Sequence, residues 1–444
     1  MNYMKAILAS LVTILIAFPV LAEVPQALLI EHVNVIPMTG ERLLKDVSVL
    51  VRDGRIAAIG PSENLKSEDG VRVIEGEGGY LLPGLVEMHV HLRKRISLDL
   101  FLGHGVTTVR NMDGTPTVLE WRDAISSGSM DGPSLTTGSP FLHRHAKDSP
   151  ERYIGSVEDA RRLVRHYAAA GYDTIKIAEV DDAPFFALME EARAVPIPVV
   201  GHIPNYELSL DRVFAERMAS VEHVEELFRV YFAYEADGSK IPAFVEMVRR
   251  SGVPISTLIA TEVVKNGLFE GREAYLTPER LAWIEKYNGA DGVAGIRRTL
   301  ASIESGDWKR HWVDIDFLLR LVRALHEAGV TIVPGTDSGG SLLISGTGLH
   351  EELALLSKAG LSPYDVIESA TVAAARVLGA IDRKGTVAVG KDADLVLVTN
   401  NPLDDLSSLR EPRGLVVRGK WYGADALAEL RSREFSDETS NPVR

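Results

Sequence analysis

The sequence predicts an α/β protein made of a (β/α)8 TIM barrel and a small β-sandwich domain assembled from both ends of the chain. Between residues 81 and 378, short apolar runs that resemble strands alternate with helix-like stretches. This alternation is typical of a parallel sheet with crossover helices. Residues 23–80 and 379–424 differ, with short β-branched runs punctuated by Gly and Asp turns. Each of these two pieces is too small to fold alone, so we expect one composite domain.

Eight apolar runs are predicted to be the strands of the barrel, because eight parallel strands alternating with helices close into this fold. The stretch from residue 260 to 329 is longer than one crossover helix needs. We therefore expect it to hold a helical insertion over the mouth of the barrel. The eight runs cover residues 84–92, 105–112, 133–139, 174–178, 198–203, 220–224, 253–259 and 330–338.

The two ends of the chain carry further expectations. Residues 1–22 place Lys5 before an apolar run that ends at the small residue Ala22, which is typical of a cleaved signal peptide. Retention of this segment as a membrane anchor is the alternative. We expect a periplasmic or secreted protein. Residues 425–444 are expected to form a polar C-terminal tail.

Composition limits the class of partner. The formal charge of −14 argues against nucleic acid or an anionic membrane surface, so we expect a small-molecule substrate and no membrane contact after signal cleavage. The chain has no cysteine and therefore no disulfides. A homo-oligomer is left open, because nothing in the sequence reports on oligomeric state.

Six ionisable side chains fall at the ends of predicted strands, where barrels of this kind carry their chemistry. Two of them, in "MHVHL", are two residues apart, so their imidazoles share one face of a strand. Imidazole and carboxylate together suit zinc or a similar divalent ion. The sequence therefore predicts a metal centre at this end of the barrel. The six residues are His89, His91, Lys176, His202, His223 and Asp337.

Lys176 needs an explanation of its own. It lies between Ile175 and Ile177 in a predicted strand, so it points to the face opposite the two isoleucines. A buried ammonium group is costly unless it is paired, neutralised or chemically changed. One interpretation is an unmodified lysine that forms an ion pair with Asp337.

The motifs "LLPGLVEMHVHL", "PGTDSG" and "GTVAVGKDADLVLV" resemble the amidohydrolase superfamily, in particular its imidazolonepropionase-like and prolidase-like (Xaa-Pro dipeptidase-type) branch. The resemblance covers nearly all of residues 27–423. It implies two divalent metal ions, with zinc as the expected ion, and an N6-carboxylated Lys176 shared between them. It further assigns the other ligands: one ion to His89, His91 and Asp337, and the second to His202 and His223.

The same resemblance implies hydrolysis of an amide or peptide C–N bond in a small dipeptide or N-acyl amino acid. The nucleophile would be a metal-bridged hydroxide, with Asp337 as the catalytic group that accepts and returns the proton. A lactonase, an esterase or a cyclic-amide hydrolase on the same site is the alternative. A non-catalytic periplasmic binding protein is a third reading, which the complete ligand set disfavours.

Three residues are candidates for substrate binding. Arg110 and Tyr231 follow the second and sixth predicted strands and could bind a substrate carboxylate. His143 belongs to a second H-x-H sequence, "FLHRH", in a predicted loop after the third strand, where it could line the pocket.

Overall fold

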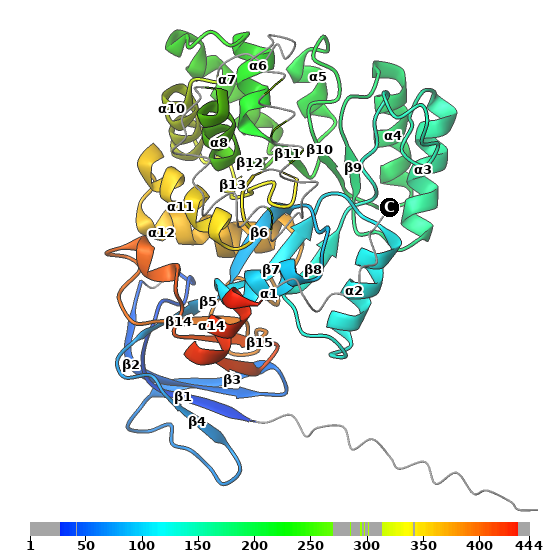
Figure 1. Ribbon diagram of the computed structural model, residues 1–444. Helices are drawn as coiled ribbons and strands as arrows, with labels where there is room; N and C mark the ends of the chain where they lie inside the picture. Colours follow the sequence, from blue (N-terminus) through cyan, green and yellow to red (C-terminus); the bar gives the residue numbers. More distant parts are fainter. Residues whose placement is uncertain are drawn as a thin grey trace, which may run out of the picture.

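The computed structural model describes residues 27–40, 42–269, 313–340 and 342–433, together with four single positions between 270 and 312 (Figure 1). The predicted signal peptide and the middle of the predicted insertion lie outside these ranges. None of the helices in the described ranges is both long and apolar enough to cross a bilayer.

The two ends of the chain meet in one eight-stranded sheet, drawn in blue and orange at the bottom of Figure 1. Its order is β16-β15-β14-β5-β1-β2-β3, and β4 pairs in parallel with the first half of β1. Strands from both termini are therefore adjacent, as expected for a composite domain, but they follow one continuous sheet order. The strands are β1 (Leu28–Val35), β2 (Leu44–Arg52), β3 (Arg55–Pro61), β4 (Arg72–Glu75), β5 (Tyr80–Pro83), β14 (Leu395–Val398), β15 (Gly414–Val417) and β16 (Lys420–Gly423).

Two tight hairpins shape this sheet. β2 and β3 are joined by Asp53 and Gly54, and β15 and β16 by Arg418 and Gly419. All four residues have positive φ, which two-residue hairpin loops of this twist require. The two turns pack together, because a Cβ at Gly54 would lie 3.1 Å from the carbonyl oxygen of Arg418. The buried side chains of the sheet form a hydrophobic core of their own.

All eight strands predicted for the barrel are present and parallel, in a three-stranded sheet β6-β7-β8 and a five-stranded sheet β9 to β13. Isolated parallel bridges link the two sheets on both sides, from Gly138 to Thr174 and from Val90 to Ser338. The strands are β6 (Leu85–Val90), β7 (Val106–Asn111), β8 (Ser134–Thr137), β9 (Ile175–Ile177), β10 (Val199–Gly201), β11 (Ser220–Glu222), β12 (Ile255–Ser256) and β13 (Ile332–Val333).

Helices alternate with these strands and bury their apolar faces against them. The predicted insertion begins within α8 and ends after α10, and only those two helices of it are described. The helices are α1 (Ile96–Gly103), α2 (Pro116–Ser126), α3 (Val157–Ala169), α4 (Asp182–Ala194), α5 (Leu210–Ala215), α6 (Val224–Phe232), η1 (Gly238–Lys240), α7 (Ile241–Ser251), α8 (Ile259–Phe269), α10 (Ile315–Glu327), α11 (Thr347–Ala359), α12 (Pro363–Glu368), η3 (Ser369–Ala373), α13 (Ala374–Val377), η4 (Leu406–Leu409) and α14 (Ala424–Ser432).

The prediction of a C-terminal tail from residue 425 is wrong for the segment that forms α14. Leu427 and Leu430, three residues apart, are both buried, and the helix packs against α1. The Arg431 guanidinium donates a hydrogen bond of 2.7 Å to the carbonyl oxygen of Gly103. Residues 434–444 lie outside the described part of the chain.

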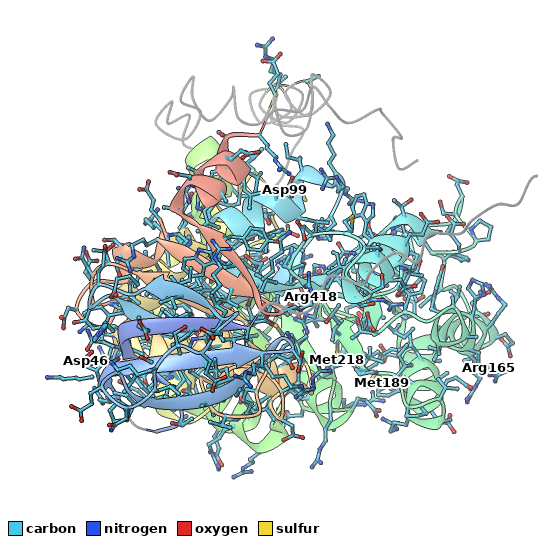
Figure 2. The ribbon with its side chains drawn as sticks, turned by 90° about the horizontal axis from the view of Figure 1, so that it is seen from below. Asp46, Asp99, Arg165, Met189, Met218 and Arg418 are labelled. Carbon is cyan, nitrogen blue, oxygen red and sulfur yellow. The ribbon has the colours of Figure 1, made fainter. Side chains whose placement is uncertain are left out.

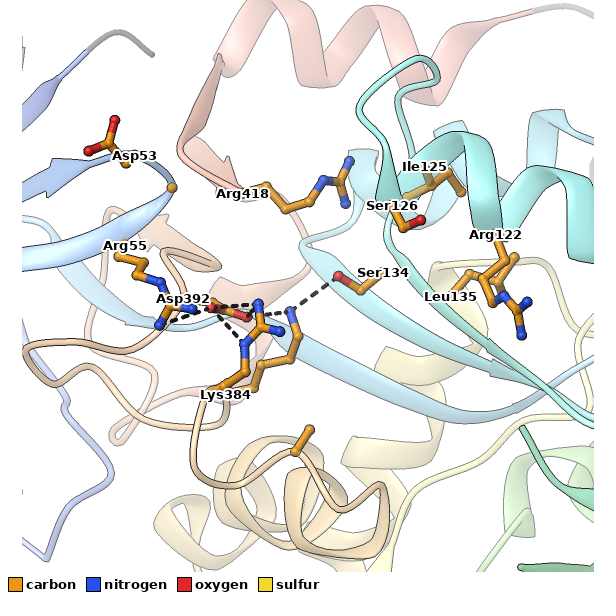
Figure 3. Close-up of a pocket in the computed structure, with 13 residues that line it drawn as sticks. Asp53, Arg55, Arg122, Ile125, Ser126, Ser134, Leu135, Lys384, Asp392 and Arg418 are labelled. Carbon is orange, nitrogen blue, oxygen red and sulfur yellow. Dashed lines mark hydrogen bonds and ion pairs between the residues drawn. The ribbon is translucent and has the colours of Figure 1, made fainter. Parts of the chain in front are cut away.

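A cavity of about 690 Å³ lies where the terminal sheet meets the amino-terminal end of β8 (Figure 3). Arg418 lies between the two regions when the molecule is seen from below (Figure 2) and donates to the carbonyl oxygen of Gly132 at 3.1 Å. The carboxylate of Asp392 forms an ion pair with the guanidinium of Arg383 at 3.0 Å and lies 3.6 Å from the ammonium group of Lys384. These basic side chains form ion pairs with acidic side chains or hydrogen bonds with carbonyl oxygens. We therefore interpret them as structural contacts that hold the terminal sheet against the parallel strands.

A substitution at Gly201 tests the close packing of β10 against β9, where Gly201 pairs with Ile177. A Cβ at this residue would lie 2.1 Å from the carbonyl oxygen of Ile177, and its φ is +141°. We expect Gly201→Ala to destabilise the protein by roughly 2–4 kcal/mol, because a backbone clash cannot be relieved by a rotamer change. Urea denaturation measures the effect. The control is Gly238→Ala, where no atom lies within 4 Å. Equal stability of the two variants would contradict this packing.

Candidate metal centre

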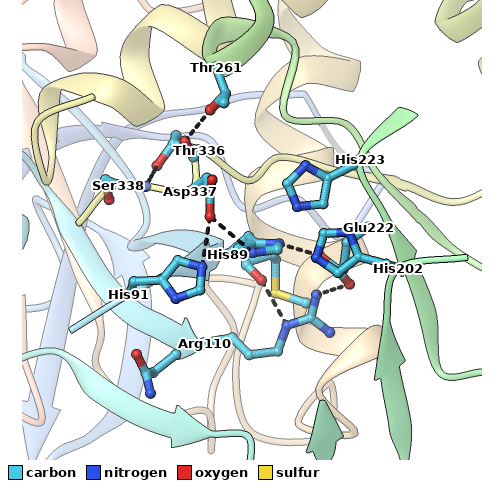
Figure 4. A network of polar contacts seen from close by, with 12 residues as sticks. His89, His91, Arg110, His202, Glu222, His223, Thr261, Thr336, Asp337 and Ser338 are labelled. Carbon is cyan, nitrogen blue, oxygen red and sulfur yellow. Dashed lines mark hydrogen bonds and ion pairs between the residues drawn. The ribbon is translucent and has the colours of Figure 1, made fainter. Parts of the chain in front are cut away.

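His89 and His91 lie at the end of β6 and point to the same side of the strand. The strand is buried along its whole length, and His89 is fully buried. Because only Val90 separates the two histidines, strand alternation puts both imidazoles on one face. Their ring centroids are 5.5 Å apart, and both rings face Asp337 (Figure 4).

Asp337 follows β13 in a turn packed tightly against β6. A Cβ at Gly339 would lie 2.0 Å from the carbonyl oxygen of His91, and one at Gly335 would lie 2.7 Å from Cβ of His89. Glycine at both places permits this approach. It brings Asp337 Oδ1 to 2.7 Å from Nε2 of His91 and 3.4 Å from Nε2 of His89. One ligand atom from each of these three side chains lies within 4.8 Å of the others, so one divalent ion could be held by all three.

His202 and His223 come from the next part of the sheet, directly after β10 and β11. Their rings are stacked, with centroids 4.5 Å apart and an interplanar angle of 17°. The ring of His223 is also 4.9 Å from that of His89, so the four histidines form one continuous group. His223 has a positive φ of 66° and starts α6, which turns its side chain back over the strand ends.

Lys176 is the middle residue of β9 and is fully buried. Its Nζ lies 5.6 Å from the ring centre of Phe141 and has no hydrogen-bond partner among the described residues. No ion pair with Asp337 forms in the described part of the chain, which argues against the simple ion-pair interpretation. Burial lowers the pKa of Lys176 to about 8, although Glu222 and Asp337 act in the opposite direction.

The surroundings of three of these groups, His89, His223 and Asp337, shift their pKa values in the directions that favour metal binding. Burial and the nearby Lys176 lower the pKa of His89 to about 3, and burial with His202 holds that of His223 well below its usual value. Burial alone would raise the pKa of Asp337, but the two β6 histidines hold it well below its ordinary range. These shifts favour neutral imidazoles at His89 and His223 and an ionised carboxylate at Asp337.

Three buried nitrogens, Nζ of Lys176, Nε2 of His89 and Nδ1 of His91, are without a hydrogen bond in the described residues. Buried polar atoms are normally satisfied, so each such atom calls for a missing partner. A divalent cation fits this set of nitrogen and oxygen donors.

The expectation that Arg110 binds substrate is not supported. The side chain is 1% exposed. Its Nε donates to the carbonyl oxygen of Met88 at 2.8 Å, Nη1 to Ser220 Oγ at 2.9 Å, and Nη2 to Glu222 at 2.7 Å. All three guanidinium nitrogens donate hydrogen bonds inside the protein (Figure 4), because the side chain of Arg110 points inward between the parallel strands. Arg110 lies within β7 and not after it, and its sequence position could not reveal this partner from β11.

The other two substrate-binding candidates lie in different surroundings. The ring of His143 is half-buried and 5.6 Å from that of Phe141, which in turn is 5.3 Å from His202. His143 is therefore one aromatic side chain away from the histidine group. Tyr231 packs its ring against Phe232 and Phe244, at 5.0 and 4.9 Å, within an aromatic cluster.

Sequence reasoning missed the carboxylates that contact the histidines. Glu222 Oε2 lies 2.9 Å from His89 Nδ1, and Glu226 Oε1 lies 2.8 Å from His202 Nδ1. Both acids belong to the sequence "EHVEE", which begins at Glu222. Acidic residues on either side of a strand-end histidine, within an otherwise apolar stretch, were the available signal.

A metal-binding measurement tests the three-ligand group. We expect His89→Ala to weaken zinc binding by at least about tenfold, because even loss of an outer partner of a ligand has that effect. Competition with a chromophoric chelator measures the affinity. His166→Ala, on the exposed face of α3, is the matched control and should bind zinc as the parent does. Unchanged affinity in His89→Ala would refute its assignment as a ligand.

Comparison with known proteins agrees with this geometry. Residues 80–422 match the family model described as "Amidohydrolase family". Imidazolonepropionase of Anaeromyxobacter sp. strain K is 27% identical over 391 residues, covering 80% of this chain and 84% of that protein. Imidazolonepropionase of Idiomarina loihiensis is 35% identical, but over only 66 residues, 14% of this chain and 16% of that one. A Xaa-Pro dipeptidase structure with bound methionine in the active site has a similar fold, with a TM-score of 0.67 at 20% identity, covering 90% of this chain and 100% of that one. The chain belongs to the amidohydrolase family, whose members are metal-dependent hydrolases of carbon–nitrogen bonds.

Proposed function

We propose that this protein is an exported, two-metal hydrolase that cleaves the amide bond of a small dipeptide or N-acyl amino acid. One observation carries the proposal: six polar side chains, from five different strands, come together in one buried group of rings and charges. The full-length likeness to imidazolonepropionase and the fold shared with a Xaa-Pro dipeptidase support amide chemistry. Export is proposed from the sequence of residues 1–22.

The residues divide naturally into two ligand groups. His89, His91 and Asp337 would hold one divalent ion, and the stacked pair His202 and His223 would hold the other. When bound, the ions polarise the scissile carbonyl and lower the pKa of an attacking water. Zinc suits these donors, although the supply of metal in the cell decides which ion is bound.

Lys176 is proposed to be N-carboxylated and to lie between the two groups. Its pKa is lowered to about 8, so part of the amine is neutral near physiological pH. The neutral nitrogen attacks the carbon of CO2: the N–C bond forms while one C=O π bond opens to an oxygen anion, and the proton released by the nitrogen passes to water. A buried cation becomes an anion with two oxygens, which the cationic surroundings of a metal site favour.

Asp337 is the proposed proton carrier of the reaction. Its contacts to His89 and His91 both use Oδ1, which leaves Oδ2 to accept a proton from the attacking water. The same oxygen can return that proton to the leaving amine. The two β6 histidines hold the pKa of this carboxyl well below its usual range, which favours the ionised form that can accept a proton.

Positive charge near the centre favours a substrate with a carboxylate. Arg93, two residues after His91, and Arg152 share one buried acid, Asp113, at 3.0 and 2.9 Å. The backbone carbonyl oxygen of Arg152 also accepts a hydrogen bond from the backbone N–H of His143 at 2.9 Å, which places Arg152 beside His143. One acid cannot neutralise two guanidinium groups, so an excess positive charge remains available for the free carboxylate of a dipeptide or an acyl amino acid.

The fold proposal accompanies the functional one. We infer that the eight parallel strands close into a barrel, because the isolated bridges join the two sheets on both sides. The terminal sheet is proposed to curl into a sandwich around its separate core, with residues 23–80 and 379–424 as one domain and residues 81–378 as the other.

A substrate panel tests the activity. We expect the zinc-loaded protein to hydrolyse members of a library of dipeptides and N-acyl amino acids. Asp337→Asn should lower kcat by about 100-fold or more, because it removes the proton carrier while leaving most of the fold intact. Amine release measures turnover. Cleavage of lactones with no amide turned over would overturn the proposal in favour of the esterase alternative.

Carboxylation of Lys176 has its own test. ¹³CO2 added to the zinc-loaded protein should give a carbamate carbon signal in NMR, and Lys176→Ala should lack it. Short-chain carboxylates should partly restore activity to Lys176→Ala by supplying the missing oxygens. A Lys176→Ala variant with full activity and no need of rescue would contradict the assigned role.

A further inference from the structure

Two carboxylates in one short segment contact histidines from two other strands. The segment runs from Glu222 to Glu226 and contains His223 between them. Glu222 lies 2.9 Å from Nδ1 of His89, and Glu226 lies 2.8 Å from Nδ1 of His202. Both contacts are at hydrogen-bond distance, and both use the same nitrogen of the imidazole ring.

Glu222 is fixed in place and ionised. Its Oε1 accepts from Arg110 Nη2 at 2.7 Å and from the hydroxyl of Ser220. Because a guanidinium is always charged, its buried partner Glu222 is the anion of this ion pair.

Glu226 is held in a similar way by a different set of donors. Its Oε2 accepts the backbone N–H of Ile203 at 2.8 Å, and its Oε1 accepts the hydroxyl of Tyr206 at 3.1 Å. The guanidinium of Arg229 stacks 3.7 Å from the centre of the Tyr206 ring. Both oxygens of Glu226 therefore already act as hydrogen-bond acceptors, one for a backbone N–H and one for a hydroxyl.

Each of these two carboxyl groups already accepts hydrogen bonds from two fixed donors, and as a carboxylate it can only accept from the imidazole as well. Nδ1 of each contacted histidine must therefore carry the proton, and Nε2 must present its lone pair. For His89, Nε2 is the nitrogen that faces Asp337. A histidine that donates from one ring nitrogen to a carboxylate is held in the tautomer and orientation that bind a metal through the other.

Glu225, in the same segment, behaves differently. It lies 3.3 Å from Nδ1 of His223, its other oxygen is buried without a hydrogen bond in the described residues, and burial raises its pKa to about 7. It is therefore not an ionised acceptor of the same kind, and it is left out of the inference.

We propose that the segment 222–226 is a positioning device: Glu222 and Glu226 fix the Nδ1–H tautomers of His89 and His202, one in each ligand group, while His223 of the same segment is itself a ligand. One five-residue stretch thus orders both halves of the site before any ion binds. The inference rests on the proposed two-metal function, but the tautomer claim can be tested without metal.

The test is made at Glu226, because Glu222→Gln would leave the buried Arg110 without its anion and destabilise the fold. In Glu226→Gln, the fixed N–H of Ile203 takes the single carbonyl oxygen of the new amide. The amide NH2 then faces His202, whose Nδ1 must become an acceptor. We expect His202 to switch to the Nε2–H tautomer. Tyr206→Phe is the control, because it removes one hydrogen bond and keeps the carboxylate.

The measurement uses the full chain, labelled with ¹⁵N-histidine and freed of metal by chelation, with the His202 signals assigned by their loss in His202→Asn. Nitrogen chemical shifts distinguish the two tautomers. We expect the Nδ1–H form in the parent and in Tyr206→Phe, and the Nε2–H form in Glu226→Gln. Zinc competition should show about 10–100-fold weaker binding of one of two ions in Glu226→Gln.

The outcomes separate this inference from the proposed function. An unchanged tautomer in Glu226→Gln, with zinc affinity equal to that of the parent, would overturn the positioning role. Fewer than two bound zinc ions in the parent would count against the two-metal function, and the metal-free tautomer shift would then decide the inference alone. A fall in thermal stability without a tautomer change would indicate a purely structural role and would also overturn it.

Discussion

The burial of Lys176 close to His89 and His223 is the constraint on which the rest of this structure depends. Lys176 has no hydrogen-bond partner in the described part of the chain, and the neighbouring histidines cannot gain protons without bringing more positive charge into the same space. Such an arrangement is costly in a protein that binds nothing there. Under the proposed function, bound ions and a carboxylated lysine would replace this repulsion by coordination, and metal binding would then be linked to folding stability.

Two features of the scaffold position the proposed ligands: close contact between backbone segments, and carboxylates from the segment 222–226. Glycines at positions 335 and 339 let the Asp337 turn lie directly on β6. Glu222 and Glu226 reach from the end of β11 and the start of α6 to histidines on two other strands. The geometry of the site is therefore shared among distant parts of the chain, and two of the proposed ligands, His89 and His202, are each held by a carboxylate that is not itself a ligand.

Much of this could be predicted from the sequence, because strand periodicity and strand-end residues are local signals. The eight parallel strands and the proximity of the six polar residues follow from them. Partners across the sheet are not local, so the burial of Arg110 against Glu222 could not be predicted. The helix α14 was missed because two leucines in a polar stretch, Leu427 and Leu430, give a weak signal until α1 is there to cover them.

The most direct measurement is anomalous diffraction at the zinc absorption edge from crystals of the zinc-loaded protein. The account predicts two peaks per chain. One should be bound by His89, His91 and Asp337 and the other by His202 and His223, with Lys176 beside both. A single peak, or peaks bound by residues elsewhere in the molecule, would contradict the two-metal centre on which the proposed chemistry depends.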